Sequence, residues 1–69
     1  MTVLTITLNG DRLDIPAPVS VTALLESLAI DVRRVAVEHN LVILKRTAFD
    51  QTMVHEGDNV EIVNFVGGG

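Results

Sequence analysis

The sequence predicts an α+β fold in which a mixed sheet of four to five strands packs on one main helix. Three observations predict this fold. Five segments are apolar or β-branched in the manner of strands, and one segment carries apolar residues at helical spacing. The order along the chain is strand, strand, helix, strand, strand, strand. A helix with one apolar stripe can bury that stripe only against the sheet, so two layers enclose a single core.

The first two strands form a hairpin. Residues 3–8 alternate in character and are rich in β-branched side chains, which is typical of a strand. Asn9-Gly10 follows, the pair that best tolerates the positive φ angles of a two-residue hairpin turn. Residues 12–15 return as the second strand, which ends at Pro16 because proline lacks a backbone donor.

Residues 21–29 are predicted to form the helix. Ser20 is a good N-cap, and Val19 and Leu24 occupy the two positions of a hydrophobic staple. The apolar stripe at helical spacing consists of Val21, Leu24, Leu25 and Leu28. Packing against the sheet is the simplest role for this stripe.

The second half of the chain supplies the remaining strands. We expect strands at residues 34–39 and 41–44, joined by a turn at Asn40. Residues 45–52 form a polar connection in which Phe49 is expected to enter the core. After a turn at residues 55–58, where Gly57 supplies an unusual backbone angle, residues 59–65 form the last strand.

The last strand is expected to carry a partner-docking surface and to lead into a tail. If it pairs beside the first strand, it lies in the middle of the sheet. Its inward positions are then Val60 and Ile62, and its outward positions are Glu61, Val63 and Phe65. Exposed apolar side chains beside a glycine thread suggest docking, so we predict that the surface consists of Val63, Phe65 and Val66. We expect a domain over residues 1–66 and a flexible tail over residues 67–69.

The composition describes one small domain that depends on its core. A chain of 69 residues buries roughly 60% of the surface that its unfolded form exposes. With no cysteine, it has neither disulfides nor thiolate ligands for a metal. The net charge of −4 argues against a nucleic-acid binder. No secretory signal and no apolar run of about 20 residues is evident, so we expect no membrane partner and a cytoplasmic location.

These segments together resemble the ThiS family, the bacterial sulfur carriers of thiamine biosynthesis with a ubiquitin-like β-grasp fold. The likeness is carried by the helix at 20–28, by residues 35–40 and 56–63, and by the final Gly68-Gly69. It covers nearly the whole chain. Two features depart from the family pattern: Gly67 is an extra glycine, and residues 41–46 lack the glycine and proline often found there.

The resemblance implies a carrier acted on by other proteins. The Gly69 carboxylate would be adenylated by a ubiquitin-activating-like enzyme that holds the ATP, with Gly67, Gly68 and Gly69 entering its active site. Sulfur from a cysteine desulfurase relay would then give a thiocarboxylate, which thiazole synthase consumes. The resemblance implies no catalytic residue, metal or cofactor in this chain.

Other readings remain open at this point. The small subunit of molybdopterin synthase shares the fold and the chemistry, a protein modifier would instead form isopeptide bonds through Gly69, and a pure binding module would not need its tail. The residues that could be proposed as catalytic are His39, Lys45, His55 and Asp58. Each is better explained as a surface or turn residue, and no nucleophile–base arrangement is evident, so we do not expect an enzyme.

Overall fold

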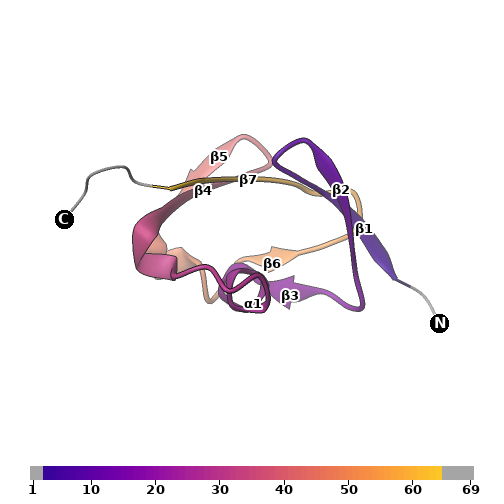
Figure 1. Cartoon of the computed structure of the whole chain (residues 1–69), viewed down its shortest axis with the longest axis horizontal. Helices are drawn as coiled ribbons and strands as arrows, with labels where there is room; N and C mark the ends of the chain where they lie inside the picture. Colours follow the sequence, from indigo (N-terminus) through magenta and orange to yellow (C-terminus); the bar gives the residue numbers. More distant parts are fainter. Residues whose placement is uncertain (1–2, 65–69) are drawn as a thin grey trace.

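The computed structural model describes residues 3–64, and the elements are drawn in Figure 1. The strands are β1 (Leu4–Leu8), β2 (Asp11–Ile15), β3 (Val19–Ser20), β4 (Val35–His39), β5 (Val42–Leu44), β6 (Met53–Val54) and β7 (Asn59–Asn64). The α-helix α1 spans Val21–Ser27, and short 3₁₀ helices span Val32–Arg34 and Arg46–Ala48. The predicted boundary between residues 1–66 and 67–69 lies outside the described residues.

The main sheet is mixed, with the strand order β2-β1-β7-β4-β5. The β1–β7 pair is parallel, whereas β1–β2, β4–β5 and β4–β7 are antiparallel. Strand β7 therefore lies in the centre of the sheet, and α1 covers one face (Figure 1). This is the two-layer α+β fold predicted from the sequence.

The first hairpin has the turn that its sequence predicts. Asn9 has a φ of 49° and Gly10 a φ of 85°, so both turn residues take the positive values of a type I′ turn. The turn sets the register of β1 and β2, in which Leu4 pairs with Ile15 and Leu8 with Asp11.

The helix begins where predicted and ends two residues earlier. The Ser20 hydroxyl accepts a hydrogen bond of 3.0 Å from the backbone N–H of Ala23, which confirms the N-cap. At the other end Ala29 takes a φ of 60°. Its N–H bonds to the Glu26 carbonyl, and the N–H of Ile30 bonds to the Leu25 carbonyl, which is the Schellman pattern. The predicted end at Ala29 was therefore wrong, because Ala29 is the left-handed residue that stops the helix.

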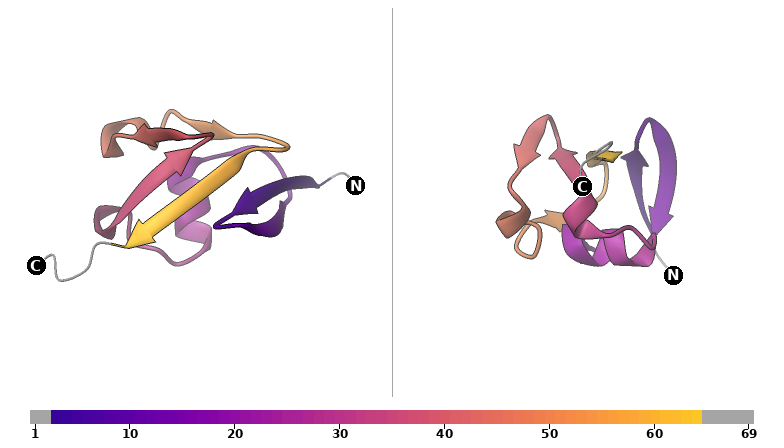
Figure 2. Two further views of the ribbon diagram at one scale, coloured as in Figure 1. Left: turned by 90° about the horizontal axis from the view of Figure 1, so that it is seen from above. Right: turned by 60° about the vertical axis from the view of Figure 1, so that its left-hand side comes forward.

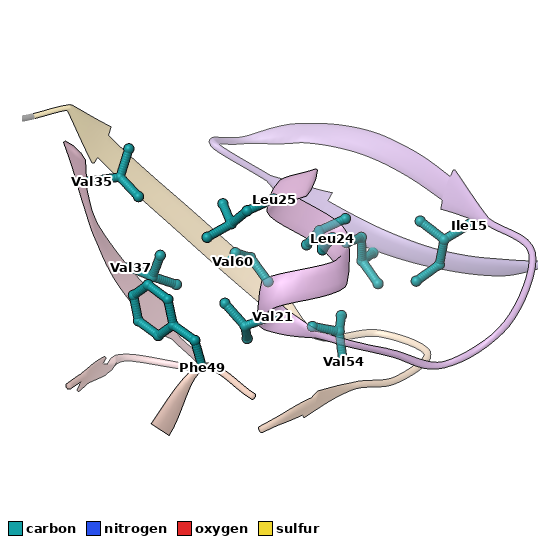
Figure 3. Close-up of a cluster of buried hydrophobic side chains, with 10 residues drawn as sticks. Ile15, Val21, Leu24, Leu25, Val35, Val37, Phe49, Val54 and Val60 are labelled. Atoms are coloured by element: carbon teal, nitrogen blue, oxygen red, sulfur yellow. The ribbon is translucent and has the colours of Figure 1, made fainter. Parts of the chain in front are cut away.

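The core lies between α1 and the sheet, as Figure 3 shows. Within residues 3–64 the buried apolar side chains are Ile6, Ile15, Val21, Leu24, Leu25, Val35, Val37, Phe49, Val54 and Val60. The predicted helix stripe faces inward, with Leu28 partly buried at its end. Phe49 is buried and closes the core from the connection after β5, as predicted.

The structure also contains a small second sheet that the sequence did not predict. Strands β3 and β6 pair antiparallel, with Val19 opposite Val54 and Ser20 opposite Met53. Each strand has two residues, which is too short to produce a recognisable alternation. The pairing ties the entry to α1 to the segment that precedes β7.

Four strand starts also differ by one residue from prediction. Strand β1 begins at Leu4, β2 begins at Asp11, β4 begins at Val35 after the 3₁₀ helix, and β5 begins at Val42. The last shift arises because Asn40 and Leu41 both have positive φ values, 49° and 71°, and together form the turn.

Candidate functional site

The candidate site is the face of the sheet that α1 does not cover, at the end of β7. On this strand Val60 is buried and Ile62 packs against the core, whereas Glu61 and Val63 are exposed. The predicted orientation is thus confirmed for these four residues, and Val63 is 63% exposed. The other residues predicted to act at this site are Phe65, Val66, Gly67, Gly68 and Gly69, which lie outside the described residues.

The end of β7 is held by a side chain from the first hairpin. The parallel β1–β7 ladder pairs Thr7 with Asn59 and Leu8 with Val60. Beyond this ladder, the side chain of Asn9 forms hydrogen bonds to β7. Its Oδ1 accepts from the Ile62 N–H at 2.7 Å, and its Nδ2 donates to the Ile62 carbonyl oxygen at 3.3 Å. The side-chain amide therefore continues the hydrogen bonding of β7 as far as Ile62, two residues beyond the last ladder pair.

The uncovered face is hollowed along β7. The β1–β2 and β4–β5 hairpins rise on either side of this strand, on the face away from α1 (Figures 1 and 2). The hollow, which we call the outer groove, is lined among others by Asn9, Ala36, Glu38, Ile43, Glu61 and Val63. Of these residues only Val63 was predicted to be a docking residue. Ala36, Glu38 and Ile43 reach the groove through the pairing of β4 with β5 and β7, which no local sequence pattern determines.

Strand register explains how the groove residues meet. Ala36 lies opposite Val63, and Glu38 lies opposite both Glu61 on β7 and Ile43 on β5. Apolar side chains therefore flank a pair of glutamates that sit directly across the strands. Like charges in this arrangement repel each other.

The residues that could be mistaken for a catalytic group form a structural network instead. The Asp58 carboxylate bonds to His39 Nε2 at 2.8 Å, and it accepts from the His55 N–H at 2.9 Å and from Asn40 Nδ2 at 3.2 Å. Asn40 Oδ1 accepts in turn from the Asn59 N–H at 2.8 Å. The network joins the β4–β5 turn to the turn before β7, so it stabilises one end of the antiparallel β4–β7 pair, the end at which β7 begins.

The same contacts determine the charge state of Asp58. Burial by itself raises the pKa of its carboxyl group, but the hydrogen bonds from His39, His55 and Asn40 outweigh burial and hold the pKa below its ordinary value. Lys45 is exposed and lies directly before the second 3₁₀ helix. It takes no part in the hydrogen bonds described for this network.

Among the described residues there is no group of three or more His, Cys, Asp or Glu side chains placed to hold a metal ion. No helix within residues 3–64 has the length and apolarity needed to cross a membrane.

A mixed sheet with a parallel β1–β7 pair at its centre and one helix across a single face defines a ubiquitin-like β-grasp protein. A model of the ThiS family matches residues 5–69. The chain belongs to the ThiS family, as the sequence resemblance predicted.

Solved structures and relatives agree with this assignment. The crystal structure of the thiamine biosynthesis protein ThiS from Geobacter metallireducens superimposes with a TM-score of 0.84 at 39% identity, covering 96% of this chain and all of that one. A thiazole synthase of Paramagnetospirillum magneticum is 45% identical over 62 residues, which are 90% of this chain. This chain spans only 19% of the length of that enzyme. The uncharacterized protein ycf40 of Pyropia yezoensis is 36% identical over 66 residues, which are 96% of this chain and 93% of that protein.

Proposed function

We propose that this chain carries sulfur, as a thiocarboxylate on Gly69, for the thiazole moiety of thiamine. The Gly69 carboxylate oxygen attacks the α-phosphorus of ATP on an adenylating enzyme, and pyrophosphate leaves. A relay persulfide then attacks the acyl carbon with its outer sulfur, and AMP leaves. A second thiol reduces the acyl disulfide so formed, which releases the thiocarboxylate and leaves a disulfide on the donor. Thiazole synthase then receives the sulfur atom of this thiocarboxylate. The chain acts as a carrier and not as an enzyme.

The observation that carries the proposal is the place of β7. The strand that precedes the glycines is the central one, bonded to β1 and β4 and held at Ile62 by Asn9. A strand held in this way gives the short glycine tail a fixed point of attachment, so that the tail can be directed into the active site of a partner. At about 3.3–3.6 Å per residue, Val66 to Gly69 can extend roughly 13 Å, a depth that suits an enzyme channel.

The chemistry of the tail is consistent with this role. An α-carboxyl group has a pKa of about 3.5, so at neutral pH it is an anion and attacks without a neighbouring base. Glycine has no Cβ, so the last atoms can approach a nucleotide without a side-chain clash. Because the chain has no cysteine, the sulfur must come from outside, and we propose a cysteine desulfurase relay as its source.

The proposed function requires two protein partners. The adenylating enzyme supplies ATP and activates the tail, and we expect it to dock on Val63, Phe65 and Val66. Thiazole synthase is supported as acceptor by the Paramagnetospirillum magneticum thiazole synthase, one part of which is similar to this chain.

Deleting Gly68 and Gly69 tests the proposal in cells. The truncated gene is expected to fail to restore thiamine-independent growth to a strain that lacks its own sulfur carrier, whereas the full-length gene restores it. A matched control removes Gly67 alone, which shortens the tail but keeps the final pair. Growth supported by the truncated gene would contradict the carrier function. Rescue of molybdopterin synthesis alone would assign the chain to that pathway instead.

A further inference from the structure

The cationic side chains of this chain are gathered at one end of the main sheet, the end at which β7 leads to the glycines. Strand β4 begins at Val35, which lies opposite Asn64 at the end of β7. Strand β5 returns to the same end, because Leu44 lies opposite Val37 (Figure 2, left). Four of the five lysine and arginine residues directly precede β4 or directly follow β5, and these are Arg33, Arg34, Lys45 and Arg46.

One of these four cations is already paired within the chain. Arg33 forms an ion pair of 3.1 Å with Asp31, so its charge is largely neutralised where it lies. Arg34 lines a hollow together with Asn64, which places it directly beside the end of β7. Within residues 3–64 three of the cations are exposed and form no ion pair, and these are Arg34, Lys45 and Arg46.

Several carboxylates lie at the opposite end of the sheet, where β7 begins. Asp58 directly precedes β7. Glu56 accepts a hydrogen bond of 2.9 Å from the Thr5 N–H, and Asp14 lies opposite Thr5 on β2. The chain carries a net charge of −4, so the unpaired cations beside the end of β7 are a local exception to its acidic character. Such an uneven distribution of charge orients the encounter with a charged partner.

The proposed chemistry gives these cations a reason to lie at this end. The tail finishes in a carboxylate and has to approach the triphosphate of ATP, which is also an anion. Repulsion between the two, added to the negative charge of the whole chain, would slow the encounter. Attraction between cations at the base of the tail and carboxylates of the partner would offset that repulsion, since complementary charges speed association.

We infer that Arg34, Lys45 and Arg46 contact carboxylate side chains around the entrance of the active-site channel of the adenylating enzyme. The inference rests on the proposed function for the identity of this partner. The contact acts mainly on the rate of association, because exposed charges at the rim of an interface affect encounter more than they affect dissociation. Nucleic acid is a poorer partner, because three exposed cations on a chain of net charge −4 provide few contacts to phosphate.

Stopped-flow measurement of association between the full chain and the adenylating enzyme from the same organism tests the inference. The variants are Arg34→Gln, Arg46→Gln and the double variant. Arg12→Gln is the matched control, since it removes the same charge from an exposed arginine on β2, at the opposite edge of the sheet from β5. We expect the association rate constant to fall about threefold in each single variant and about tenfold in the double variant, and to stay close to the parent value in the control.

Further readouts separate a charge contact from damage to the fold. Arg34 and Arg46 are exposed, so their glutamine variants should melt at the temperature of the parent. Slower association by an equally stable protein cannot be explained by unfolding. Added salt should slow association of the parent more than that of the double variant, so that the two rate constants converge. The dissociation rate constant should change little.

Several results would overturn the inference. These are variants that associate as fast as the parent, a parent chain that does not bind the enzyme, and an equal loss in Arg12→Gln, which would show an effect of net charge alone. The measurement is made without ATP and repeated with it, and a loss seen only with ATP would mean that the cations meet the nucleotide instead. Binding of the parent, but not of the double variant, to single-stranded RNA would assign the cations to nucleic acid.

The inference and the proposed function can fail separately. If the tail is never converted to a thiocarboxylate but the rate constants depend on Arg34 and Arg46 as expected, the function fails and the charge contact stands. If conversion proceeds and the variants associate like the parent, only the charge contact fails.

Discussion

Asn9 holds both main-chain polar groups of Ile62 with one side-chain amide, at 2.7 Å and 3.3 Å. The same residue forms the first position of the β1–β2 turn, with a φ of 49°. One asparagine therefore both closes the first hairpin and completes the hydrogen bonding of the central strand. It couples the local geometry of the first ten residues to the strand that precedes the glycines.

This coupling can be tested by changing Asn9. Asn9→Gly keeps the positive φ but removes both hydrogen bonds to Ile62, so we expect a loss of about 1–2 kcal/mol in stability. The amide hydrogen of Ile62 should exchange with solvent faster in that variant. Asn9→Asp keeps the acceptor oxygen and tolerates the turn, so protection of the Ile62 amide should largely remain. Equal exchange in the parent and the glycine variant would contradict the coupling.

The Asp58 network predicts a pH dependence of stability. The pKa of Asp58 is lowered in the folded protein, so its contribution is fully present above the unfolded pKa of about 3.9 and is lost as the pH falls through the folded value. At pH values below about 4, the melting temperature of the parent should therefore decrease. Asp58→Asn should start from a lower melting temperature and show a shallower fall.

Asp31→Asn is the matched control for that experiment. The pKa of Asp31 is also lowered, chiefly by hydrogen bonds from Arg33, but this pair is exposed. Exposed pairs contribute little, so the acid branch of the melting curve should remain close to that of the parent. An equal change in both variants would mean that burial of Asp58 has no special importance.

The helix end predicts opposite effects for one substitution at two sites. Ala29 has a φ of 60° at the Schellman turn, so Ala29→Gly should stabilise the protein by about 1 kcal/mol. Ala23 lies within α1, so Ala23→Gly should destabilise it by about 1 kcal/mol. Chemical denaturation of both variants gives the two signs. Destabilisation by both would show that the strain at Ala29 is not relieved by glycine.

The small core predicts a large effect of truncation at Leu25, which is fully buried. Leu25→Ala should cost about 2–5 kcal/mol, a large part of the stability of a domain this size. Leu41→Ala removes the same atoms from a side chain that is 80% exposed, and should change the unfolding free energy by less than about 0.5 kcal/mol. Similar losses at both positions would contradict the assignment of the core.

Sequence reasoning succeeded where a feature is determined locally. The Asn9-Gly10 turn, the Ser20 cap and the inward stripe of α1 each follow from a few neighbouring residues. It failed at Ala29, because the left-handed residue that ends the helix is an alanine and not the glycine that usually signals it. It also missed β3 and β6, whose pairing joins two-residue segments that are far apart in the chain.

The outer groove could be predicted only in part, for a related reason. The alternation along β7 correctly placed Val63 on the exposed face. The opposition of Glu38 and Glu61, and the approach of Ile43, depend on the register between strands that no local pattern determines. The docking role of Val63, Phe65 and Val66 stays a prediction.

The most direct test of the carrier function is the intact mass of the purified chain. The chain is incubated with ATP, the adenylating enzyme, a cysteine desulfurase supplied with cysteine, and a thiol reductant. We predict a mass increase equal to the exchange of one oxygen atom for one sulfur atom, located by fragmentation on Gly69 and absent without ATP. An unchanged mass under conditions in which the enzyme adenylates a known ThiS protein would contradict the account, as would a sulfur atom located elsewhere in the chain.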